Sequence, residues 1–118
     1  MDLEAVINTV SLKFQDKKLG IWAMSMGTTI ASRSFPAIKK KVDFIIGEGF
    51  VTNTATIIDR YKVLGKQLTL PEKFTIYEKA IQSIDIPLLI FTASNDTITT
   101  HEDALNLKAK IGKGCRVI

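Results

Sequence analysis

A serine with small residues two positions before and two positions after it is the first group in this sequence with a recognisable chemical role. Ser25 lies in the run Ala23-Met24-Ser25-Met26-Gly27, which has the pattern small-x-Ser-x-Gly between an apolar and a helical stretch. Such a tight turn strains the serine backbone, and the small residues let strand and helix approach each other. The pattern predicts a nucleophile at Ser25 and an oxyanion donor at the Met26 amide, at the positive end of the helix. An ordinary serine in a turn between strand and helix would also fit it.

A carboxylate follows a later apolar run of the same kind. The run Pro87–Thr92 leads into Asn95-Asp96 and is the second such run after the one that precedes Ser25. At the C-terminal end of a parallel strand, Asp96 would reach a histidine beside Ser25, orient its ring and stabilise its charged form. Glu48, at the end of the intervening run, is the alternative acid, and we favour Asp96. Asn-Asp before a threonine is also turn chemistry in its own right.

The elements that must position these groups alternate along the chain. Apolar spacing predicts a first helix from Leu3 to about residue 15, with Asp2 as its N-cap. Four apolar runs predict strands at Leu19–Met24, Val42–Ile46, Pro87–Thr92 and Cys115–Ile118. Further helices are expected at Thr28–Arg33, Thr54–Leu64, Pro71–Ser83 and Thr99–Ile111. This order predicts an α/β protein with three α/β/α layers, a mostly parallel sheet, and the strand C-termini along one rim.

Several local expectations follow from this arrangement. Pro36 should stop the second helix, because the residue before a proline avoids helical geometry. Thr99 should cap the last helix in a capping box with Glu102. Because parallel strands of such folds are covered on both faces, Trp22 and Met24 are expected in the core. Cys115, which opens the last strand, is expected to be buried as well.

Together these segments resemble the α/β-hydrolase superfamily. Leu19–Ala31 is similar to its nucleophile-elbow region, and Ile86–Ile111 to its acid-bearing strand and helix. The resemblance implies a partial α/β-hydrolase fold in which residues 1–118 form a single domain and supply the fifth to eighth of eight strands. Residues 50–84, which match no motif, would form a lid or pocket segment. A second oxyanion amide would come from a loop after the third strand, which has no counterpart here, and Ala23 stands where the elbow often has glycine.

The histidine of the triad is the missing part. In the superfamily it follows the eighth strand, so we expect it beyond Ile118, and we expect residues 1–118 alone to be inactive. His101, the one histidine present, begins the last expected helix, where a solvent-exposed role is the simpler expectation. The resemblance implies a serine hydrolase that acts on an ester, thioester or related small acyl substrate through a Ser-His-Asp triad. A short likeness of Ile86–Asp96 to fatty-acyl transferases and thioesterases gives acyl transfer as an alternative.

Composition argues against several other classes of function. The 118 residues are 46% hydrophobic and 24% charged, which is ordinary for a globular protein, and no apolar run approaches the ~20 residues of a membrane span. The net charge of +4 comes with lysine clusters at 17–18 and 39–41 but without interleaved aromatics, so we expect no nucleic-acid partner. One histidine and one cysteine cannot supply the usual metal ligands, and no cofactor is indicated. The single cysteine and the missing signal peptide favour a cytoplasmic protein.

A second hypothesis belongs to a different class. Without preceding strands, the edge of Leu19–Met24 would be apolar and unpaired, which favours pairing with another chain. The chain would then be a non-catalytic, self-associating or partner-binding domain, in the simplest case a homo-oligomer joined through this exposed sheet edge.

Overall fold

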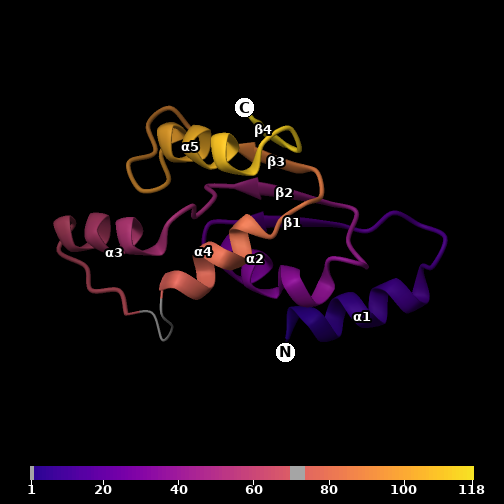
Figure 1. Cartoon of the computed structure of the whole chain (residues 1–118). Coiled ribbons are helices and arrows are strands. Elements are labelled where there is room, and N and C mark those ends of the chain that lie inside the picture. The colour runs from indigo at the N-terminus through magenta and orange to yellow at the C-terminus, as the bar shows by residue number, and fades with distance from the viewer. Residues whose placement is uncertain (1, 70–73) are drawn as a thin grey trace.

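Four strands form one parallel sheet. The computed structural model describes residues 2–69 and 74–118, and the sheet order is β1-β2-β3-β4 (Figure 1). The strands are β1 (Gly20–Met24), β2 (Phe44–Glu48), β3 (Leu88–Phe91) and β4 (Cys115–Val117). The helices are α1 (Leu3–Lys13), α2 (Met26–Ile38), α3 (Thr54–Val63), α4 (Phe74–Gln82) and α5 (His101–Ile111). The predicted α/β class and the parallel sheet are confirmed, with all strand C-termini along one rim.

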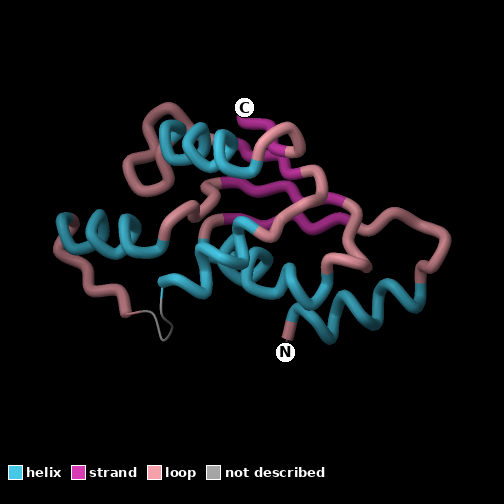
Figure 2. Tube along the Cα trace, in the orientation of Figure 1, coloured by secondary structure: helices cyan, strands magenta, loops and turns pink. Residues whose placement is uncertain are grey.

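The core lies between one face of the sheet and the helices. Four side chains that share a row across the strands are at most 8% exposed: Ile21, Ile45, Leu88 and Cys115. Buried residues from α1, α2, α3, α4 and α5 belong to the same cluster. The helices therefore pack on the same face of the sheet. Figure 2 shows the helices and strands of this arrangement along the chain. Cys115 is buried as predicted, and burial raises the pKa of its thiol.

The opposite face of the sheet is exposed. Successive side chains of a strand point to opposite faces, so Trp22 and Met24 lie on the side away from Ile21 and Ala23. Trp22 is 72% exposed and Met24 is 59% exposed, which makes their predicted place in the core wrong. Among the described residues the helices cover one face of the sheet, so the second helical layer expected from the sequence is not part of them.

Two predictions about helix ends are wrong, those for Pro36 and Thr99. Pro36 lies inside α2, which continues to Ile38, because Phe35 and Ile38 on either side of it are at most 1% exposed. Burial of two large side chains, worth about 1.5–3 kcal/mol each, offsets the cost of about 3 kcal/mol for an internal proline. The cap of α5 is Thr100, not Thr99.

The other helix ends follow the expected capping chemistry. Asp2 caps α1, and its Oδ1 accepts a hydrogen bond of 3.1 Å from the Glu4 amide. The Thr100 hydroxyl accepts from the Asp103 amide while the Asp103 carboxylate accepts from the Thr100 amide, which completes a capping box one residue later than predicted. The start predicted for the fourth helix at Pro71 lies outside the described residues.

Candidate active site

Ser25 occupies a sharp bend between β1 and α2. Its φ is 48° and its ψ is −119°, and no other non-glycine residue among those described has a positive φ. L-amino acids rarely adopt this conformation, because the Cβ crowds the neighbouring carbonyl. The Ser25 amide donates to the carbonyl of Glu48 over 2.8 Å, which ties the bend to the end of β2. Ser25 itself is exposed, so its hydroxyl is accessible at the rim.

Thr28 holds the bend from inside. This residue is fully buried, and its hydroxyl donates to the Ser25 carbonyl over 2.6 Å while accepting from the Val51 amide over 3.0 Å. Its own amide donates to the same carbonyl. The Val51 carbonyl in turn accepts from the buried Tyr77 hydroxyl of α4. The sequence analysis missed Thr28, because a threonine three residues after a serine has no distinctive pattern.

The small residues around the bend lie close together, but not at the limit of contact. A Cβ placed on Gly27 would stand 4.0 Å from the Cβ of Ala23, an ordinary van der Waals distance. Met26 is the first residue of α2, so its amide belongs to the turn whose N–H groups have no acceptor within the helix. That amide therefore points out of the N-terminus of α2, directly beside Ser25.

The carboxylate of Asp96 is fixed in the loop between β3 and α5. Its Oδ1 accepts hydrogen bonds of 2.8 Å from the amides of Ile98 and Thr99, and its Oδ2 accepts one of 2.6 Å from the Thr99 hydroxyl. Partial burial alone would raise the pKa of Asp96, but these hydrogen bonds and the nearby charge of Arg60 leave it below its usual value. The group is thus held as a carboxylate in a single orientation.

Arg60 of α3 clamps this loop from the other side. Its Nη1 donates to the carbonyl of Ile98 over 2.6 Å, and its guanidinium makes a two-pronged ion pair with Asp103 of α5. The side chains of Arg60 and Asp103 are 27% and 20% exposed, so the pair is partly shielded from solvent. Arg60 of α3 therefore helps to position the loop that carries Asp96.

Ser25 and Asp96 line a common cavity at the rim of the sheet. The cavity has a volume of about 260 Å³ and is lined by Met24, Ser25, Glu48, Gly49, Phe91, Thr92, Ala93 and Asp96. Gly49 lies between the two proposed site residues, at a φ of 58°. A Cβ on Gly49 would stand 3.9 Å from the Ser25 nitrogen and 4.0 Å from the Asp96 Oδ2. The absence of a side chain at Gly49 leaves the space between the bend and the carboxylate open.

The alternative acid, Glu48, lines the same cavity from a different direction. Its strand position is paired with those of Met24 and Phe91, which are 59% and 39% exposed. Its side chain therefore belongs to the exposed face of the sheet, whereas Asp96 is fixed by three hydrogen bonds. This difference favours Asp96 as the fixed acid, and Glu48 remains the alternative on the exposed face of the sheet.

His101 does not line this cavity, but it contacts Thr92, which does. Its Nδ1 is 2.7 Å from the Thr92 hydroxyl oxygen, and that hydroxyl also lies 3.0 Å from the Ile118 carbonyl oxygen. The Thr92 hydroxyl donates to Ile118 and accepts from Nδ1 in the tautomer that carries the proton on Nδ1, and it can donate to Nδ1 in the other tautomer. His101 is exposed at the first position of α5 and contacts Thr92 instead of Ser25.

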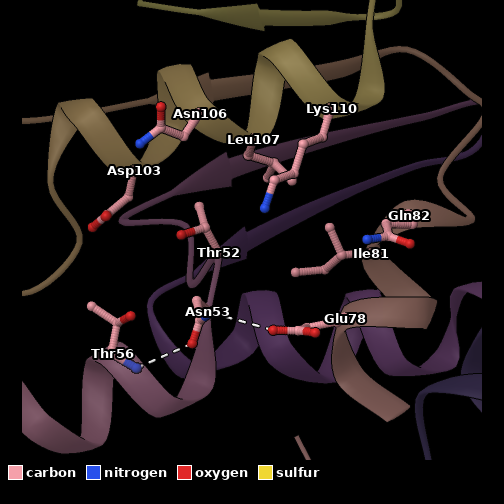
Figure 3. A pocket seen from close by; sticks show the side chains of 10 residues that line it. All are labelled: Thr52, Asn53, Thr56, Glu78, Ile81, Gln82, Asp103, Asn106, Leu107 and Lys110. Atoms are coloured by element: carbon pink, nitrogen blue, oxygen red, sulfur yellow. Dashed lines mark hydrogen bonds between the residues drawn. The ribbon is translucent and has the colours of Figure 1, made fainter. Parts of the chain in front are cut away.

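A second, polar hollow of about 220 Å³ lies between α3, α4 and α5 (Figure 3). Asn53 caps α3 through the Thr56 amide and also donates to Glu78 over 3.3 Å. Ser25 and Asp96 do not line this hollow.

Within the described parts of the chain, no three histidine, cysteine or acidic residues are grouped to hold a metal ion. No helix among the described elements is long and apolar enough to cross a membrane.

Comparison with solved structures identifies the architecture. The esterase domain of a Rhodothermus marinus protein matches 98% of this chain with a TM-score of 0.70 at 17% identity, over 54% of its own length. The chain has an α/β-hydrolase-like fold. The Paleococcus ferrophilus monoacylglycerol lipase and the mouse alpha/beta hydrolase domain-containing protein 10 have TM-scores of 0.60 and 0.57, each at 14% identity. Both match the whole of this chain, over 65% and 59% of their own lengths.

The α/β-hydrolase-like fold fits the resemblance predicted from the elbow and the acid-bearing strand. No family model matches the sequence, and no curated protein matches it, so the likeness is one of fold. The chain spans about half of the esterase domain and less than two thirds of the other two proteins. Those proteins therefore contain segments with no counterpart in these 118 residues.

Proposed function

We propose that the protein is a serine hydrolase for ester, thioester or related acyl substrates, with Ser25 as nucleophile and Asp96 as the acid of the triad. The observation that carries the proposal is the positive φ of Ser25, at the mouth of a cavity that Asp96 also lines. A strained, exposed serine at the start of a helix is what a nucleophile elbow requires. The fold alone would not support this, since it hosts many functions.

The groups at the bend suit each step of acyl transfer. A base removes the Ser25 proton as Oγ attacks the substrate carbonyl, and the oxyanion that forms accepts from the Met26 amide at the positive end of α2. The base then gives the proton to the leaving group, and a water repeats the sequence to release the acid. A second oxyanion donor would come from a part of the protein outside these residues.

Asp96 retains the capacity that its role requires. A carboxylate oxygen can accept two hydrogen bonds, and its Oδ1 already accepts two while its Oδ2 accepts one. One acceptor position on Oδ2 therefore remains for the N–H of an imidazole. Because the pKa of Asp96 is lowered, the group stays charged and can stabilise an imidazolium.

The base is proposed to lie after β4. The Ile118 amide donates to the Ile90 carbonyl, and the Thr92 amide donates to the Ile118 carbonyl, so this strand ends at the rim next to the loop that carries Asp96. A histidine a few residues further along would emerge at the same rim. His101 is the alternative, and it would have to leave Thr92 to reach Ser25.

The test is covalent labelling with a fluorophosphonate. In the full-length protein we expect Ser25 to be labelled and Ser25→Ala to prevent it, whereas Ser94→Ala, an exposed serine on the same rim, should have no effect. In the 118-residue chain we expect labelling to be at least ~1,000-fold slower, because the base is missing. Unchanged labelling of Ser25→Ala would refute the nucleophile. Fast labelling of the 118-residue chain that His101→Ala abolishes would place the base at His101.

Acyl transfer to an acceptor other than water is the alternative within the same chemistry. It needs the same acyl-enzyme on Ser25 and differs in what resolves it. Product analysis after single turnover separates the two, since hydrolysis gives the free acid and transfer gives a new ester or thioester.

A non-catalytic, self-associating domain is the second candidate, and the exposed sheet face favours it. Trp22, Met24 and Phe91 lie on that face, and β1 is an edge strand of the sheet. Trp22 is the only tryptophan of the chain, so its quenching by acrylamide reports on this face alone. Self-association predicts that quenching of the 118-residue chain falls with rising protein concentration while light scattering rises. Concentration-independent quenching of a monomer would exclude it.

A further inference from the structure

The net charge of the chain is concentrated in two loops. Residues 13–18 and 39–43 hold six lysines and two aspartates, so the whole formal charge of +4 lies there and the rest of the chain is neutral. The first segment follows α1 and the second joins α2 to β2. Both lie at the N-terminal ends of the strands, opposite the rim that carries Ser25, and Figure 1 shows them on the side away from α3. We refer to this part of the molecule as the basic end.

The lysines of the basic end converge on one hollow. Lys17 and Lys18 line it from the first loop, and Lys40 and Lys41 from the second, around a volume of about 290 Å³. All four are exposed. Asp43 also lines the hollow, where it accepts a hydrogen bond of 2.7 Å from the Leu19 amide, and its single negative charge leaves the four lysines in excess.

An exposed aromatic side chain lies among these lysines. Phe14 lines the hollow with them and is 51% exposed. The ammonium of Lys13 lies 5.7 Å from the centre of the Phe14 ring. Lysines next to an exposed phenylalanine are a combination that binds membrane surfaces, because the cations attract anionic headgroups and the aromatic ring enters the interface.

We propose that the basic end docks the protein onto an anionic membrane surface, with Phe14 at the interface and the lysines on the headgroups. The charge asymmetry would attract any polyanion, but the Phe14 ring contributes to binding lipid and not to binding a nucleic-acid backbone. In this orientation the rim with Ser25 faces away from the membrane. The surface is independent of the proposed hydrolase activity.

The experiment is sedimentation of the 118-residue chain with vesicles. We expect binding to phosphatidylcholine vesicles that contain ~30% phosphatidylserine at low salt, and strong weakening as salt screens the charges. Each lysine near an anionic surface contributes about a fivefold gain in binding, so K17Q/K18Q/K40Q/K41Q should bind at least ~10-fold more weakly. F14Q should bind several-fold more weakly. The matched control K62Q/K66Q/K110Q/K113Q removes the same charge from exposed lysines elsewhere and should stay within about twofold of the original chain.

Three results would overturn the proposal. Equal binding to pure phosphatidylcholine vesicles would assign the interaction to the exposed sheet face around Trp22. An equal loss of vesicle binding in the control variant would show that binding depends on the net charge of the chain and not on the basic end. Tighter binding to duplex DNA than to vesicles, with F14Q unaffected, would identify a nucleic-acid surface. Circular dichroism checks that each variant is folded, and the salt dependence of the unmodified chain tests the charge term without any substitution.

Discussion

Replacement of Ser25 by glycine should stabilise the protein, although it removes the proposed nucleophile. At a φ of 48° and a ψ of −119°, Ser25 occupies a backbone conformation that glycine adopts freely. Hydrogen bonds from Thr28 to the Ser25 carbonyl and from the Ser25 amide to Glu48 hold the bend in place, and both use backbone atoms that a substitution leaves intact. The side chain of Ser25 makes no capping hydrogen bond to α2. Its removal therefore relieves strain at little cost in contacts.

The size of the effect follows from two opposing terms. A non-glycine residue in such a conformation costs roughly 1–3 kcal/mol. Glycine gains freedom in the unfolded chain, which costs about 0.4–1 kcal/mol. We expect Ser25→Gly to raise the free energy of unfolding by about 1 kcal/mol. Ser25→Ala keeps the Cβ and the strain, so it should stay within about 0.5 kcal/mol of the original protein.

Urea unfolding of the 118-residue chain measures this difference. With a slope of about 1–2 kcal/mol per molar urea, Ser25→Gly should move the midpoint upward by roughly 0.5–1 M. Ser11→Gly in α1, where the backbone is helical, is the matched control and should lower stability by about 0.5–1 kcal/mol. A midpoint for Ser25→Gly at or below that of Ser25→Ala would show that the bend stores no strain, and the argument for an elbow would lose its basis.

Two further predictions concern the loop that carries the acid. Arg60→Met should lower the free energy of unfolding by about 1–2 kcal/mol, because it leaves the partly buried Asp103 without its partner. Lys62→Met is the control, since it removes an exposed ion pair with Asp59 on the same helix. It should cost less than about 0.5 kcal/mol in the same urea titration. The pKa values of Asp96 and Asp103 are lowered by folding, so their stabilisation is present above about pH 4 and is lost as the pH falls through the folded values. Asp96→Asn should therefore flatten the loss of thermal stability between about pH 5 and pH 2, and an unchanged profile would contradict the assigned shift.

The shared cavity of Ser25 and Asp96 was predictable, because residue type and position along the chain coincide. Ser25 and Asp96 both follow apolar runs, and parallel strands bring the residues after such runs to one rim, so their common cavity follows from the pattern. Thr28 and Arg60 were not predictable. Their partners are the Val51 amide and the Ile98 carbonyl, 23 and 38 residues away, and backbone groups leave no mark in a sequence. Residues that hold a site through main-chain atoms become visible only when the fold is known.

The exposed face of the sheet marks the limit of the pattern argument for the fold. A continuous apolar run such as Leu19–Met24 predicts a strand covered on both faces, because it carries apolar side chains on each. The structure places Ile21 and Ala23 under the helices and leaves Trp22 and Met24 exposed. Burial of a large apolar side chain contributes about 1.5–3 kcal/mol, so this face supplies a substantial driving force for whatever covers it. Each proposed function provides a cover for this face. In the hydrolase, further segments of the kind that its longer structural neighbours contain would cover it. In the self-associating domain, a second copy of the chain would cover it.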